Sequence, residues 1–224
     1  MKLLLGFLCL LLVRPASADL VISGVSDGTD AGGNPKSIEL VALTPIADLS
    51  NFFILRDTNG STDGVFSVSS DFQLPAVSLD VGEFFYIYGN NDSEATLEGL
   101  GFGDTDSNTA TTSSIASING DDIFAVSSSL DTSGVIDTFG LAGQGDTNFY
   151  EDSIAYRKAG SGPNPTGVLD GGNFDISGYS EAGLNSNFGT FQVTAVPEPS
   201  IFGCLAVLAG AGFYGRARRG NSAD

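Results

Sequence analysis

The sequence predicts an all-β protein with an antiparallel sandwich or barrel at its centre. Short apolar runs recur along the chain, and Asp-Gly, Asn-Gly and Gly-Gly pairs that suit tight turns separate them. Between residues 19 and 195 the only helical candidate is one or two turns at 93–100. Many short strands with frequent turns are typical of an antiparallel sandwich or barrel.

The strongest predicted strand is 83–88, in which the run from Phe84 to Tyr88 is entirely apolar or aromatic. Such a run indicates a central strand buried on both faces. Tyr86 and Tyr88 share one face, and we expect them to pack in a core rather than to face a glycan. The other predicted strands are 20–25, 37–43, 52–56, 122–127, 135–139 and 153–157.

The N-terminus has the three parts of an export signal in order. Lys2 supplies a positive charge, residues 3–13 form an apolar stretch, and Ala16 and Ala18 form a small-x-small cleavage site. The apolar stretch is too short for a stable membrane anchor. We therefore expect 1–18 to be a signal peptide that is removed after Ala18.

The C-terminal residues 196–224 have a different composition from the rest of the chain. Prolines at 197 and 199 precede an uncharged apolar segment, 201–214, and arginines follow it. As a helix this segment is about 21 Å long, shorter than the roughly 30 Å hydrocarbon core of a bilayer. The cationic end should stay in the cytoplasm and leave the preceding domain outside.

This tail resembles the PEP-CTERM sorting signal of Gram-negative bacteria that make exopolysaccharide. The resemblance covers roughly the last 29 residues and rests on the Pro-Glu-Pro triplet, the apolar stretch and the Arg-rich end. It implies recognition by exosortase, a membrane-bound transpeptidase-like cysteine protease, and delivery to the cell envelope, the surface or the extracellular matrix. The residues that carry it are Pro197, Glu198, Pro199, Arg216, Arg218 and Arg219.

The segment between the two ends is strongly acidic. It holds 25 of the 27 acidic residues and four cations, which gives a formal charge of −21. Such a surface repels phosphate backbones, so we expect no nucleic-acid partner. The chain has no His, and its two Cys, Cys9 and Cys204, lie in the terminal apolar segments. These absences exclude His-based and thiol-based catalysis and zinc-thiolate sites from the domain.

The order of the predicted strands resembles the lamin-tail domain, an immunoglobulin-like sandwich, over residues 20–157. Gly24 stands where that family often has Glu, and Phe52 where it often has Trp. The resemblance implies a non-catalytic accessory or adhesion module. Its carriers include Leu20-Val21-Ile22-Ser23, Asn34 to Leu40, Asp48 to Phe52, Phe72 to Pro75, Leu79 to Phe84, Asn119 to Asp122 and Val135 to Asp137.

Two loops begin like calcium-binding loops. The first has Asp57, Asn59 and Asp63, and the second has Asp104 and Asp106. Both lack the Gly at the sixth position and the Glu at the twelfth that an EF-hand needs, so turns capped by Asx side chains are expected. A weaker Ca²⁺ site of another kind stays open as an alternative.

Paired carboxylates raise the alternative of a secreted hydrolase. The visible pairs are 121–122 and 151–152, but adjacent residues on a strand point to opposite faces, so neither is a natural acid–base couple. Glu39 and Arg157 are expected to form a structural cross-strand pair. We therefore expect no enzymatic activity and no required cofactor.

The sequence thus predicts a signal peptide at 1–18, a lamin-tail-like immunoglobulin-like sandwich at 19–160, a loosely ordered Gly/Asn-rich extension at 161–195, and a sorting signal at 196–224. The predicted function is that of an exported surface or matrix module. Its expected partners are the export machinery, exosortase, and exopolysaccharide or envelope components. A weakly calcium-binding or glycan-binding adhesin is the alternative.

Overall fold

The computed structural model describes residues 20–60, 66–140, 148–165 and 171–193. The chain divides into a unit that ends at Val193 and a second unit from Thr194 onward. The second unit lies outside the described residues, and so do the predicted signal peptide and the whole sorting signal.

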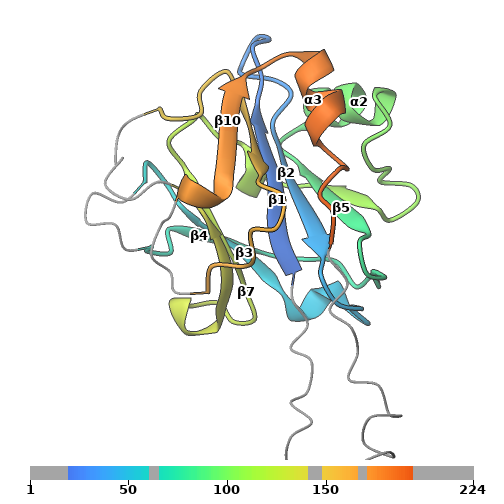
Figure 1. Ribbon diagram of the computed structural model, residues 1–224, viewed down its shortest axis with the longest axis vertical. Coiled ribbons are helices and arrows are strands. Elements are labelled where there is room, and N and C mark those ends of the chain that lie inside the picture. Colours follow the sequence, from blue (N-terminus) through green and yellow to red (C-terminus); the bar gives the residue numbers. More distant parts are fainter. Residues whose placement is uncertain (1–19, 61–65, 141–147, 166–170, 194–224) are drawn as a thin grey trace, which may run out of the picture. The chain divides into compact units, whose positions relative to one another are not determined.

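Most of the regular secondary structure in the described residues lies in two β-sheets (Figure 1). The six-stranded sheet has the order β10 (Phe174–Gly178), β9 (Ser153–Arg157), β1 (Leu20–Asp27), β2 (Ser37–Ala42), β5 (Phe84–Tyr88) and β6 (Ala110–Thr112). The four-stranded sheet has the order β4 (Ser70–Gln73), β3 (Phe53–Asp57), β7 (Ile123–Ser127) and β8 (Val135–Phe139). The helices are α2 (Asn91–Gly99) and α3 (Glu181–Asn187), with 3₁₀ turns at Leu49–Asn51, Ser114–Ala116, Thr132–Gly134 and Gly171–Asn173.

The seven predicted strands are all present, and the predicted helical turns are α2. Three short strands, β4, β6 and β10, were not predicted, because none has a clear alternation of apolar residues. The pairing is antiparallel as expected, except that β6 runs parallel to β5. That exception arises because α2 and the loop after it carry the chain back to the starting end of β5 before β6 begins.

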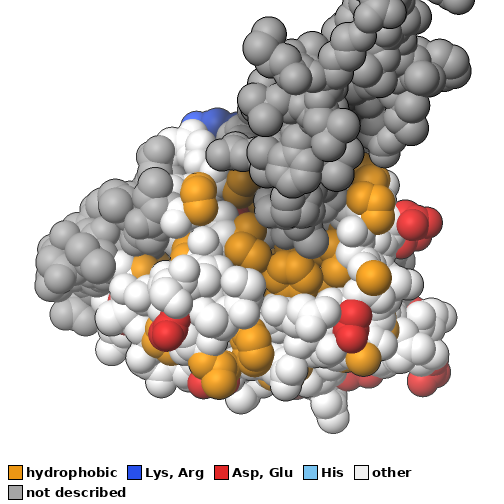
Figure 2. Space-filling view, turned by 90° about the horizontal axis from the view of Figure 1, so that it is seen from below, with side chains coloured by type: hydrophobic (Ala, Val, Ile, Leu, Met, Phe, Trp, Pro, Cys, Tyr) orange, Lys and Arg blue, Asp and Glu red, His pale blue; other side chains and the backbone are white. Residues whose placement is uncertain are grey.

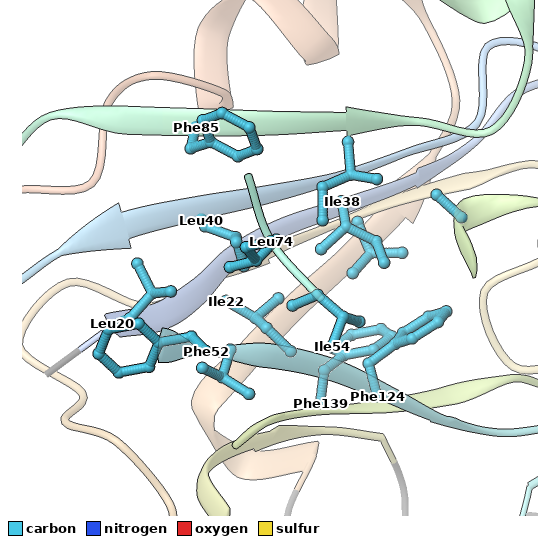
Figure 3. Close-up of a cluster of buried hydrophobic side chains, with 14 of the residues drawn as sticks. Leu20, Ile22, Ile38, Leu40, Phe52, Ile54, Leu74, Phe85, Phe124 and Phe139 are labelled. Atoms are coloured by element: carbon cyan, nitrogen blue, oxygen red, sulfur yellow. The ribbon is translucent and has the colours of Figure 1, made fainter. Parts of the chain in front are cut away.

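The main apolar core lies between the two sheets, as in a β-sandwich (Figure 3). Ile22, Ile38, Leu40 and Phe85 enter it from the six-stranded sheet and are fully buried. Side chains of β3, β7 and β8 meet them from the other sheet, and each such side chain contributes about 1.5–3 kcal/mol when fully buried. The facing residues of the four-stranded sheet are Ile54, Phe124, Val126 and Phe139.

A β-bulge in β1 shifts its inward-facing residues by one position. Ile22 pairs with Leu40 and Gly24 pairs with Glu39, which leaves Ser23 as the extra residue. The core-facing residues of β1 are consequently Leu20, Ile22 and Val25. The bulge also turns the Ser23 hydroxyl toward the carboxylate of Glu39, with 2.6 Å between Oγ and Oε1.

The outer face of the six-stranded sheet is covered by a second apolar cluster. Tyr86 and Tyr88 pack there with Leu97 of α2 and with Leu184 and Phe188 at α3. Strand β5 is therefore buried on both faces, as its sequence predicts. The two tyrosines lie in this cluster and are 6% and 0% exposed, which confirms core packing.

The sandwich extends beyond residue 160, where the sequence places its end. Strand β10 pairs antiparallel with β9 along its whole length, and Phe174 enters the main core. Leu184 of α3 is fully buried in the outer cluster. Part of the expected loose extension is thus an edge strand and a packed helix, because its few apolar residues are spaced to reach the two clusters.

Candidate functional site

A cleft of about 850 Å³ opens beside the start of β5. One wall is the extended segment at 76–79, and the other is the loop at 101–109. Phe84 is half-buried in it and stacks on Tyr86, with 6.5 Å between ring centroids. Polar side chains that line the cleft are Ser78, Glu83, Ser107, Asn108 and Thr109.

A smaller cleft of about 420 Å³ shares Asn108 with the first and lies along β6. Its acidic group is Glu94, whose carboxylate accepts hydrogen bonds from Thr105 at 3.1 Å and from Thr112 at 2.7 Å. The residues that line the two clefts include two carboxylates and no Lys or Arg. The combined surface suits a neutral or cationic ligand better than an anionic one.

Acidic side chains outnumber basic ones on the visible surface. Figure 2 shows one face of the molecule, on which a few acidic side chains lie scattered among uncharged and apolar ones and a basic group lies at the edge. Three ion pairs form among the described residues, and two of them are buried. Most carboxylates of the described residues are therefore outside these ion pairs, which makes self-repulsion large at low salt.

The predicted calcium residues serve local structure where they are described. Asp57 is buried and accepts hydrogen bonds from the backbone N–H and the hydroxyl of Ser67, each at 2.9 Å. Asn59 takes a positive φ of 62°, which suits a tight turn, and Asp63 lies outside the described residues.

The second loop is a turn held by its own aspartate. Asp104 accepts hydrogen bonds from the Asp106 backbone N–H and from the Ser107 hydroxyl, and these two bonds lower the pKa of Asp104. Within the described ranges no three acidic or thiol side chains gather as a metal-binding group. Calcium binding stays a prediction for this protein.

The two carboxylate pairs lie in different surroundings. Asp121 and Asp122 are buried, and burial raises the pKa of Asp122, although Arg56 lies near enough to oppose the change. Glu151 and Asp152 are exposed. Neither pair lines the two clefts beside β5 and β6.

The predicted pair of Glu39 with Arg157 is wrong, because β1 lies between the two strands that carry them. Arg157 is buried and forms an ion pair with Asp137 of the other sheet. Its Nε donates to the carbonyl of Ile22 at 2.6 Å, while Asp137 accepts the N–H of the same residue at 2.9 Å. The pair therefore satisfies backbone groups of β1 where β9 does not reach them.

Glu39 is a buried carboxylate that lies outside the ion pairs of the described residues. It is 1% exposed and receives hydrogen bonds from Ser23 and from the backbone N–H of Gly189, each at 2.6 Å. None of the three ion pairs of the described chain includes it. The sequence gives no sign of this, because the segment that covers Glu39 comes 150 residues later.

Neither described helix is long and apolar enough to cross a membrane; the predicted segment 201–214 lies outside the described residues. Comparison of the chain with protein-family models, with curated proteins and with solved structures found no match.

We expect moderate salt to raise the melting temperature, because screening weakens repulsion among the unpaired carboxylates. The measurement is a melting curve at about 10 mM and about 150 mM NaCl, where the Debye length falls from roughly 30 Å to roughly 8 Å. CaCl₂ and MgCl₂ at matched ionic strength separate screening from binding: a rise specific to Ca²⁺ indicates a site. A melting temperature that is the same at both salt concentrations would contradict destabilisation by repulsion among the carboxylates.

Proposed function

We propose that the protein is an exported, envelope-sorted, non-catalytic module of the cell surface or extracellular matrix, and that exosortase processes its tail. The observation that carries this proposal is the ordered trio at the C-terminus: Pro197-Glu198-Pro199, the apolar segment, and the arginines. The signal-like N-terminus agrees with it, since a signal peptide directs a chain across the inner membrane, where the tail would be recognised. Export machinery, exosortase, and exopolysaccharide or envelope components are the proposed partners.

All the strands of the two sheets lie between the two proposed processing sites. Strand β1 begins at Leu20 and is buried along its full length, so the folded domain uses the chain from the second residue after the proposed cleavage site. The unit that contains both sheets ends at Val193, a few residues before the Pro-Glu-Pro motif. Removal of both ends would leave the two sheets complete.

We further propose that the domain is a lamin-tail-like, immunoglobulin-like sandwich. Several motifs that carry the resemblance fall on strands of the two sheets, such as the Ser37 to Leu40 run on β2. The departure at Gly24 has a physical reason in this chain: a Cβ there would lie 2.6 Å from the Phe188 ring. Phe52, at the other departure, packs in the main core.

The experiment that tests the proposal is the intact mass of protein recovered from the envelope of a host that carries an exosortase. A mature chain that begins at Asp19 and lacks the apolar segment supports it. A chain that keeps both ends contradicts it.

A second candidate function is recognition of a neutral glycan, which the cleft beside β5 favours. The cleft combines a half-buried aromatic ring, Phe84, with hydroxyl and amide side chains, and this mixture suits the apolar faces and hydroxyls of a sugar. Its carboxylates disfavour an anionic polysaccharide.

We expect Phe84→Ala and Asn108→Ala each to weaken binding to neutral exopolysaccharide of the host by tenfold or more, an effect of about 1.4 kcal/mol. The matched control is Val81→Ala, because Val81 is 47% exposed near the cleft but does not line it. Affinity electrophoresis in gels that contain the polysaccharide measures the effect. Equal retardation of all four proteins would remove this candidate.

A further inference from the structure

The backbone just after α3 is hydrogen-bonded to the six-stranded sheet through one buried carboxylate. Glu39 lies on the outer face of β2, and its Oε2 accepts the backbone N–H of Gly189 at 2.6 Å. Its Oε1 accepts the hydroxyl of Ser23 at 2.6 Å. Residues 188–193 continue from α3 to the point where the C-terminal tail begins.

The local structure is built to bring this segment against the sheet. Phe188 ends α3 and packs over Gly24, where a side chain would collide with its ring. Gly189 has a φ of 68°, a left-handed conformation that favours glycine, and this conformation accompanies the turn of its N–H toward Glu39. The bulge in β1 supplies the facing hydroxyl of Ser23.

The groups that face Glu39 are neutral. Ser23 faces it from β1, the Tyr86 hydroxyl from β5, and the Gly189 N–H from the segment after α3. Burial raises the pKa of Glu39 to about 7, although the bonds from Ser23, Gly189 and Tyr86 favour the charged form. The pKa of Tyr86 is itself raised by burial and by Glu39, so this tyrosine stays neutral below pH 8.

We propose that Glu39 is a pH-sensitive latch that holds Gly189 on the sheet in mildly acidic solution and loosens its hold as the pH rises to neutrality. The sign follows from hydration. With the latch closed, ionisation puts a charge in a buried site without a cation. With the latch open, water reaches the carboxylate and its pKa returns toward the ordinary value of 4.5. Rising pH therefore favours the open form until Glu39 is ionised in both forms.

This inference goes beyond the proposed function and does not depend on it. Opening would free the chain a few residues before the tail, at Gly189, whose N–H is otherwise bound by Glu39 of β2. The latch thus ties the accessibility of that segment to the pH around the domain.

The test is hydrogen exchange on the purified chain, read by mass spectrometry in the peptide that covers 184–193. After correction for the intrinsic pH dependence of exchange, we expect protection of this peptide to fall by about one to two orders of magnitude between pH 5 and pH 8. Strand β10, at the edge of the same sheet, serves as the internal control and should show no matching loss. Unchanged protection at 184–193 overturns the proposal.

Two variants separate the latch from general loosening. Glu39→Gln keeps a carbonyl acceptor for Gly189 but cannot ionise, so protection at 184–193 should no longer depend on pH. Ser23→Ala removes one hydrogen bond to the carboxylate, so the midpoint of the loss should move to higher pH. An E39Q protein that keeps the wild-type pH dependence overturns the proposal.

A carboxyl-carbon NMR titration of Glu39 in the wild-type chain keeps the test independent of any variant that fails to fold. A titration midpoint near 7 supports the latch, and a midpoint below 5 overturns it.

Discussion

Replacing Arg157 with methionine is expected to lower the free energy of unfolding by about 3–5 kcal/mol. The side chains of Arg157 and Asp137 are both fully buried, so the change leaves the Asp137 carboxylate without its counter-charge inside the sandwich. The change also removes the Nε donor to the Ile22 carbonyl and the stacking of the guanidinium on Phe174, whose ring centroid is 4.7 Å away. Urea denaturation measures the loss as a lower transition midpoint.

The neighbouring residue provides a matched control. Lys158 forms an exposed pair with Asp175 at 3.4 Å, so Lys158→Met should cost less than about 1 kcal/mol. Adding Asp137→Asn to R157M should recover part of the loss, because it removes the stranded charge and keeps an oxygen for the Ile22 N–H. Equal losses for the two single variants would show that the inter-sheet pair does not stabilise the fold as argued.

Replacing Arg216, Arg218 and Arg219 together with serine is expected to abolish processing of the tail. The apolar segment is shorter than the hydrocarbon core of the bilayer. The arginines would therefore hold its inner end at the cytoplasmic surface. Without them the segment would no longer present Pro197-Glu198-Pro199 just outside the bilayer in an extended form. The expected product is unprocessed or misoriented protein, detected by intact mass and by fractionation.

Replacing the same three arginines with lysine is the matched control, since lysine keeps the positive charge and also snorkels. Normal processing of the lysine variant and failure of the serine variant would assign the effect to charge. Normal processing of both would remove the arginines from the sorting account.

Many strands of the sandwich are predictable because each has a recognisable pattern of apolar residues in its own sequence. The apolar run of β5 indicates burial on both faces, and the outer cluster confirms it. The alternation in β2 places Ile38 and Leu40 in the main core, where they lie. In these strands neighbouring residues along the chain determine which side chains are buried, so the sequence alone is sufficient to predict them.

The remainder depends on contacts between distant residues. Arg157 belongs to a predictable strand. Its ion-pair partner, Asp137, follows from the order of the strands in both sheets, which the sequence does not show. Glu39 was expected to pair with Arg157, but its partners depend on the bulge in β1, which supplies Ser23, and on Gly189, which lies 150 residues later. Strand β10 and α3 lie in a Gly/Asn-rich stretch and are held by a few side chains, Phe174 for β10 and Leu184 and Phe188 for α3.

The cleft beside β5 illustrates the same limit for a candidate site. Phe84 was predicted as part of a buried strand, and Asn108 belongs to a loop that was read only as a turn. They line one cleft because the loop after α2 folds back toward the start of β5. No spacing in the sequence brings these two residues together.

The most direct test of the central claim is the intact mass of the mature protein from the envelope fraction of an exosortase-bearing host. The account predicts one species that begins at Asp19 and ends before the apolar segment 201–214, so that Arg216, Arg218 and Arg219 are absent. A mature species that begins at Asp19 but continues to Asp224 would contradict the sorting claim and leave an exported domain with a permanent tail. A species that begins at Met1 would contradict export itself.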